Sequence, residues 1–116
     1  MRFGCCANMV ATGPSGFGLE IVEQLAELGY DYVELSLAHM MALSEAEFRA
    51  LAGRVARSGI RCEACNNFYP RTVRLTGADV DWQQVQDYTA RALNTFPGGS
   101  RLDHGGISCR SHPINW

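Results

Sequence analysis

Three short runs of strand-forming residues, each followed by a segment with helical periodicity, constrain this chain more than any other feature. The runs occupy residues 2–6, 31–37 and 60–65 and are rich in apolar, β-branched or aromatic side chains. Strands separated by helices pair in parallel through right-handed crossovers. The sequence therefore predicts an α/β fold with the element order βαβαβα.

The three helical segments carry recognisable ends. Gly29 and Gly59 supply the left-handed conformation that closes the first and second helices. Ser44 and Glu47 have the spacing of a capping box at the start of the second helix, and Asp81 can cap the third. The residues predicted to face the core are Ile21, Val22, Leu25 and Leu28, then Phe48, Leu51, Ala52 and Val55, and finally Val85, Tyr88, Ala92 and Leu93.

The second strand alternates between apolar and polar side chains, and Glu34 lies in the middle of its polar face. A central strand of an open, doubly wound sheet is covered on both faces and is apolar throughout. In a βα barrel only the outer face packs on helices, and the inner face carries active-site groups near the carboxyl end of each strand. The pattern favours the barrel, with an edge strand that has one solvated face as the alternative.

A glycine-rich segment at residues 12–18 connects the first strand to the first helix, where phosphate-binding loops occur. It has neither the Gly-Lys-Ser/Thr ending of a nucleoside triphosphate loop nor the spacing of a dinucleotide fingerprint. We therefore expect a flexible connection, and anion binding by backbone amides at the helix start is the alternative.

Five cysteines without a spaced disulfide framework are typical of a reducing compartment. Cys62 and Cys65 have the spacing of a zinc or redox pair. In a regular strand, however, positions three apart face opposite sides of the sheet. We therefore predict that both are free cysteines inside the fold.

Composition places the chain among ordinary globular proteins. Its 116 residues suffice for one domain, and 47% hydrophobic with 19% charged residues excludes a disordered chain. The formal net charge of -2 gives no basic patch for nucleic acid, and no apolar run is long enough for a membrane span or a secretory signal. We expect a cytoplasmic protein with neither nucleic acid nor membrane as partner.

The segments "ELGYDYVELSL", "SEAEFRALAGRVARSGIRCEACNNFYP" and "RLTGADVDWQQVQDYTARAL" carry a resemblance. Together they resemble the amino-terminal part of the sugar phosphate isomerase/epimerase family, the xylose-isomerase-like TIM barrel group. The resemblance depends on three motifs in this order: a strand ending in Glu-Leu, an Asn-x-Phe-x-Pro strand exit and a Leu-x-Gly-x-x-Val-Asp helix start. The resemblance implies that residues 1–96 are three βα units of a (β/α)8 barrel.

The resemblance also implies a function. Members of the family move a proton between adjacent carbons of a ketose or hydroxy-carbonyl substrate, with a divalent metal (Mn²⁺, Mg²⁺ or Zn²⁺) held by strands of the second half of the barrel. This chain stops before those strands, so no metal ligand or catalytic residue is assigned and no cofactor is expected in it. The matching positions are on the sugar-binding side: Asn8, Glu34, His39, Asn66, Asn67 and Phe68.

The carboxyl-terminal segment, residues 97–116, departs from the family. It is rich in glycine and has no strand-length apolar run, so we expect an irregular or disordered tail that is either native or the product of a frame change near Thr95. The spacing of His104, Cys109 and His112 matches no common metal site. Three strands cannot close a barrel, and the exposed sheet edge favours a homo-oligomer or aggregation.

The leading hypothesis is thus a truncated isomerase/epimerase-like barrel that is inactive alone. A complete small α/β ligand-binding module, as a monomer or a dimer, is the alternative. A nucleic-acid enzyme of the apurinic endonuclease-like branch is a weaker third hypothesis, because the chain has no basic stripe.

Overall fold

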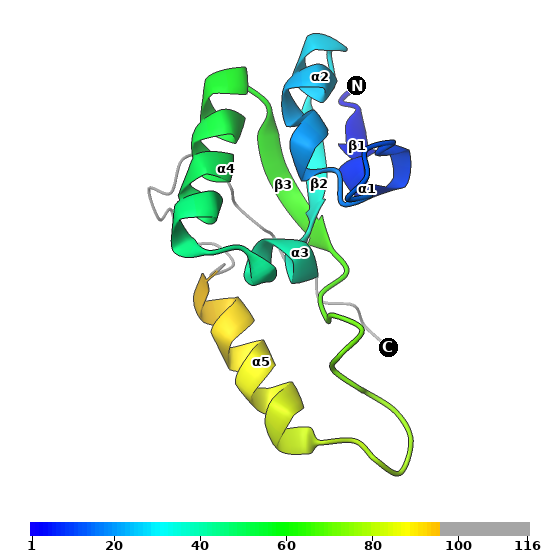
Figure 1. The fold of residues 1–116 in the computed structure, drawn as a ribbon. Coiled ribbons are helices and arrows are strands. Elements are labelled where there is room, and N and C mark those ends of the chain that lie inside the picture. The colour runs from blue at the N-terminus through cyan, green and yellow to red at the C-terminus, as the bar shows by residue number, and fades with distance from the viewer. Residues whose placement is uncertain (96–116) are drawn as a thin grey trace.

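The computed structural model describes residues 1–95 and has three parallel strands with helices between them (Figure 1). The sheet has the order β1-β2-β3. The predicted α/β class is confirmed. The elements, in chain order, are β1 (Gly4–Cys6), α1 (Ala7–Val10), the 3₁₀ turn η1 (Leu19–Ile21), α2 (Val22–Glu27), β2 (Tyr32–Ser36), α3 (Leu37–Ala42), α4 (Glu45–Ser58), β3 (Arg61–Asn66) and α5 (Trp82–Thr95).

One face of the sheet is covered by helices. Figure 1 shows α2 and α4 side by side against this face. Val33 and Leu35 of β2 point into the layer between sheet and helices and are fully buried. The other residues that fill this layer are Cys5, Val22, Leu25, Leu51, Val55, Ile60 and Cys62. The predicted apolar face of the second strand therefore packs on helices, as a βα unit requires.

The helix ends follow the sequence signals. Gly29 and Gly59 adopt the left-handed conformation, with φ of 84° and 77°. The Ser44 hydroxyl accepts from the Glu47 amide while the Glu47 carboxylate accepts from the Ser44 amide, which completes the capping box. Asp81 accepts a hydrogen bond from the backbone amide of Gln84 at 3.0 Å. These predictions are confirmed, because each depends on residues that are near neighbours in sequence.

Two residues predicted to be buried are exposed. Leu28 is 75% exposed, because α2 ends at Glu27 and Leu28 already belongs to the turn before β2. Leu93 is 47% exposed. Helix α5 lies beyond the carboxyl ends of the strands, past α3, so within residues 1–95 only one side of it is covered (Figure 1). The short helices α1 and α3 were not predicted from periodicity, since each is shorter than two turns.

The exposure of Leu28 leads to a prediction about stability. Because this side chain makes little contact with the core, Leu28→Ala should change the free energy of unfolding by no more than about 0.5 kcal/mol. Guanidinium unfolding followed by circular dichroism measures the change. A loss of about 2 kcal/mol or more, as for a buried leucine, would mean that α2 continues through Leu28 and packs as the periodicity suggested.

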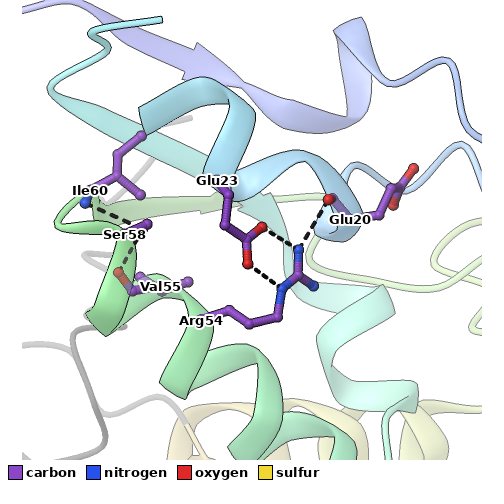
Figure 2. A network of polar contacts seen from close by, with 6 residues as sticks. All are labelled: Glu20, Glu23, Arg54, Val55, Ser58 and Ile60. Carbon is purple, nitrogen blue, oxygen red and sulfur yellow. Dashed lines mark hydrogen bonds and ion pairs between the residues drawn. The ribbon is translucent and has the colours of Figure 1, made fainter. Parts of the chain in front are cut away.

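The two helices on the sheet are joined by a polar network around Arg54 of α4 (Figure 2). Arg54 donates from Nε to Oε1 of Glu23 at 2.6 Å, and its Nη2 donates to the carbonyl oxygen of Glu20 at 3.0 Å. The Arg54 guanidinium holds the pKa of the Glu23 carboxyl below its usual value, first through this hydrogen bond. At the far end of α4, the Ser58 hydroxyl donates to the carbonyl of Val55. Arg54 Nη2 also donates to Oε2 of Glu23, and this bidentate ion pair fixes α2 against α4.

Strand β3 contains an extra residue relative to its neighbour. Val33 pairs with Cys62, but Glu34 pairs with Ala64, so Glu63 is the bulged residue. Beyond the bulge the register continues to Ser36 opposite Asn66. Beyond the bulge, the side chains of β3 therefore point to the faces opposite to those that strict alternation from Cys62 would predict.

The bulge corrects one premise of the sequence analysis. Cys62 and Cys65 pair with Val33 and Leu35, so they belong to the same face of the sheet and not to opposite faces. Cys62 is fully buried and free, as predicted. Cys65 is half-buried and disulfide-bonded, so the prediction of a free thiol is wrong for this residue.

The tail predicted at residues 97–116, with His104, Cys109 and His112, lies outside the described residues. Within residues 1–95, none of the helices has the length and apolar character needed to cross a membrane.

Candidate functional site

Polar side chains gather at the carboxyl ends of the strands, on the face that α2 and α4 do not cover. Register places Cys6 opposite Glu34, and Ser36 opposite Asn66. Because paired residues of parallel strands share a face, the four side chains belong to one surface. This carboxyl edge is where parallel α/β folds bind ligands.

At the centre of this edge, the side chains of Cys6, Asn8 and Asn66 form a cluster, here called the amide–thiol cluster. Asn66 Nδ2 donates to Cys6 Sγ at 2.8 Å and to Asn8 Oδ1 at 3.0 Å. The Cys6 thiol donates to Asn8 Oδ1 at 3.2 Å. Asn66 Oδ1 is buried and has no hydrogen-bond partner within the described chain. The cluster therefore joins the ends of β1 and β3 and retains one unsatisfied acceptor.

Glu34 lies beside this cluster. Its side chain is half-buried, and within residues 1–95 its carboxylate makes no hydrogen bond and no ion pair. Burial raises the pKa of the Cys6 thiol, and the nearby charge of Glu34 raises it further. At neutral pH the thiol thus stays protonated and acts as a hydrogen-bond donor to Asn8, not as a nucleophile.

His39 lies on α3 at the same edge but contacts different partners. Its Nδ1 is 2.6 Å from the hydroxyl oxygen of Ser36, which is fully buried. Its ring stacks on Phe17 of the glycine-rich segment, with 3.5 Å between ring centroids. Burial lowers the pKa of His39 below its usual value, so the imidazole is neutral at pH 7. The stack places the glycine-rich segment over the carboxyl edge.

The remaining predicted residues have mainly structural contacts. Asn67 is exposed, has a positive φ of 48° and accepts a hydrogen bond from the Ala38 amide through its carbonyl oxygen. Phe68 packs against Tyr69 and Tyr88, and its carbonyl accepts from the Tyr88 hydroxyl at 2.8 Å. The structure thus brings Asn8, Glu34 and Asn66 together, whereas Phe68 turns toward α5.

The opposite, amino end of the same sheet face is closed by an ion pair. Arg2 makes a bidentate contact with Glu63, at 2.5 and 3.1 Å, and lies over the ring of Tyr32. The Glu63 carboxylate raises the pKa of Arg2, first through this hydrogen bond. Arg2 is therefore engaged with Glu63 at the end of the sheet away from the amide–thiol cluster.

A cavity of about 570 Å³ lies apart from the cluster, between α3 and α5. It is lined by Ala38 and Met41 on one side and by Val73, Tyr88 and Arg91 on the other. Of the predicted site residues, none lines this cavity. The polar cluster at the strand ends is the candidate site, because the thiol with a raised pKa and the unpaired carboxylate are found there.

The described residues do not fit the divalent metal that the resemblance implies. From Met1 to Thr95, no group of three or more His, Cys, Asp or Glu side chains is arranged to hold a metal ion. Among the described residues beside Glu34, the amides of Asn8 and Asn66 are neutral and the Cys6 thiol stays protonated, so Glu34 is a single anionic ligand. No step of a reaction is therefore assigned to a metal in this part of the chain.

Three members of the site were not predicted from the sequence: Cys6, Ser36 and Phe17. Cys6 was given no role, although it ends β1 in the same register as Glu34. Ser36 was recognised as polar, but its hydrogen bond to His39 depends on the turn of α3 that follows β2. Nothing in the sequence indicated that Phe17 stacks on His39.

Burial raises the pKa of the Cys62 thiol to about 12, from 9.0. Because the unfolded thiol loses its proton first, the folded state binds more protons above pH 9.0. The stabilising contribution is complete below pH 9.0 and is lost as the pH rises toward 12. We expect the free energy of unfolding to fall by up to about 1.4 kcal/mol per pH unit in this window.

Denaturant unfolding at several pH values above and below 9.0, followed by circular dichroism, measures this slope. The matched control is Cys62→Ala, in which this part of the slope disappears while the other thiols and tyrosines still titrate. Equal slopes in the two proteins would show that Cys62 is not the group responsible.

Comparison of the chain with models of protein families, with curated proteins and with solved structures finds no match in any of the three.

Proposed function

We propose that residues 1–95 are the first three βα units of a (β/α)8 barrel enzyme of the sugar phosphate isomerase/epimerase type, working in the cytoplasm. One observation carries the proposal: the sheet has one face packed on helices and one face that collects Cys6, Glu34 and Asn66 at the carboxyl ends of its strands. An inner polar face and an outer apolar face are what a barrel of parallel strands needs.

In this proposal the chain supplies the substrate-binding side of the site. The amide groups of Asn8 and Asn66 and the carboxylate of Glu34 bind and orient hydroxyl groups of a sugar. The family's proton transfer between adjacent carbons uses groups on later strands, together with a divalent metal that polarises the carbonyl oxygen when bound. The described residues hold no such set, so the isolated chain is expected to bind substrate weakly and not to turn it over.

Sequencing the source DNA through and beyond the Thr95 codon tests the proposal most directly. We expect another reading frame to continue with an apolar strand and then with Glu, Asp and His codons at later strand ends. In parallel, the isolated chain with Mn²⁺ and ketoses should give no isomerisation above a protein-free control. If no reading frame continues the βα pattern, the proposal is overturned. If the isolated chain isomerises ketoses, only the expectation that it is inactive on its own is overturned.

A further inference from the structure

We propose that the carboxyl edge of this sheet binds an uncharged, hydroxyl-bearing part of its ligand and rejects a phosphate group. This inference rests on the proposed function and specifies which end of a sugar or sugar phosphate meets β1, β2 and β3. It follows from the hydrogen-bonding groups that the site leaves unused and from the charges around them.

Glu34 provides the strongest argument. Its carboxylate is half-buried and is unpaired within the described chain. A partly desolvated carboxylate without a donor is unfavourable, and a ligand hydroxyl that donates to it offsets this cost. A phosphate placed there would set two negative charges against each other in a region of reduced dielectric.

The amide–thiol cluster adds unused hydrogen-bonding groups, both a donor and an acceptor, beside the Glu34 carboxylate. Asn66 Nδ2 already donates to Cys6 and Asn8, so Asn66 has only its buried Oδ1 left as an acceptor. Asn8 Oδ1 accepts two hydrogen bonds, and its Nδ2 donates none within residues 1–95. The available groups are therefore an uncharged donor on Asn8 and acceptors on Glu34 and Asn66. A hydroxyl group can both donate and accept, and it matches this mixture.

Cationic groups are absent from the described members of this edge. The chain has no lysine, so its cations are arginines. Arg2 is engaged with Glu63 at the amino end of the sheet. Arg61 begins β3, roughly 16 Å along the strand from Asn66. His39 is neutral at pH 7, because burial lowers its pKa. Arg71, on the exposed loop after β3, makes no hydrogen bond or ion pair with the cluster.

The glycine-rich segment does not compensate for the missing cations. Backbone amides at such a loop can bind phosphate only if they are unpaired and free of negative neighbours. Here the Gly16 amide donates to the Gly13 carbonyl, and the Phe17 amide donates to the Ser15 hydroxyl. The Ser15 hydroxyl in turn donates to the carboxylate of Glu20. A phosphate at this loop would therefore find the Gly16 and Phe17 amides engaged and the negative charge of Glu20 nearby.

The test is a ligand titration of the full-length ¹⁵N-labelled chain, observed by NMR at the side-chain amides. The probes are fructose, fructose 6-phosphate and inorganic phosphate, and the exposed amide of Asn94 on α5 is the internal control. We expect fructose to shift the Asn8 and Asn66 signals while Asn94 stays unchanged, and inorganic phosphate to shift none of the three. Fructose 6-phosphate should shift the same two signals no more strongly than fructose.

Glu34→Gln keeps the size of the side chain and removes its charge. In this variant the affinity for fructose should fall about tenfold, as expected for one charge-assisted hydrogen bond. Arg71→Gln is the matched control, and it should leave fructose binding unchanged.

Three outcomes of these titrations distinguish the inference from the proposed function. Shifts produced by fructose 6-phosphate or inorganic phosphate but not by fructose overturn the inference and leave the proposed function standing. Loss of the phosphate effect in Arg71→Gln would then identify Arg71 as the cation responsible. The absence of any shift at Asn8 and Asn66 with both sugars contradicts the proposed function itself.

Discussion

Replacing Gly18 with alanine is expected to destabilise the fold by about 2–5 kcal/mol, which is a large part of the stability of a small domain. Gly18 has a φ of 78°, a conformation that other residues rarely adopt. A Cβ atom at this position would lie 2.4 Å from the carbonyl carbon of Ala7 and 2.7 Å from the amide nitrogen of Asn8. These are backbone atoms at the start of α1, directly after β1, and they cannot move away without disturbing the cluster.

Guanidinium unfolding followed by circular dichroism measures this effect. Gly16→Ala is the matched control, because Gly16 also has a positive φ, 64°, but a Cβ atom added there would meet nothing within 4 Å. It should cost only about 1 kcal/mol, the usual penalty for alanine in this conformation. Equal losses for the two variants would show that the close approach of Gly18 to Ala7 is not what matters.

Truncation of Leu35 to alanine is the second change with a large expected effect. Leu35 is fully buried in the central strand, in register with Cys65 of β3, and packs in the layer between the sheet and the helices. Removing its side chain leaves a cavity among α2, α4 and the sheet, and such changes cost about 2–5 kcal/mol. The expected result is a lower denaturant midpoint with an unchanged slope of the unfolding transition.

The exposed Leu93→Ala is the matched control for Leu35→Ala, because the same number of atoms is removed from a side chain that is 47% exposed. Its cost should be clearly smaller, since solvent can fill much of the space that the side chain leaves. Equal losses for the two variants would contradict the burial of Leu35 as the cause of the effect.

Local signals could be predicted from the sequence, and distant contacts could not. The capping box of Ser44 with Glu47 and the glycine at position 29 involve neighbours in sequence, so their spacing alone defined the ends of the helices. Leu93 was assigned wrongly because its burial depends on where α5 lies relative to the sheet. Periodicity shows that a helix has an apolar side but not how much of that side is covered.

The site shows the same division. The family resemblance implied that Asn8 and Asn66 belong to one site, and the two side chains do form a hydrogen bond at the carboxyl edge of the sheet. The stacking of Phe17 on His39 could not, because a long glycine-rich connection can take many paths over the sheet. The facing of Cys65 was predicted wrongly because strict alternation was applied across a strand that contains a bulge.

The bulge at Glu63 also bears on how this strand tolerates insertions and deletions. A deletion inside a regular strand exchanges its two faces from that point onward. Loss of Glu63 alone would bring β3 into unbroken register, with Ala64 still opposite Glu34 and Asn66 still opposite Ser36. One contact given up would be the ion pair with Arg2. A chain that lacks the residue at position 63 could thus keep the same polar surface. A deletion two positions later, at Cys65, would instead exchange the two faces of the strand beyond it.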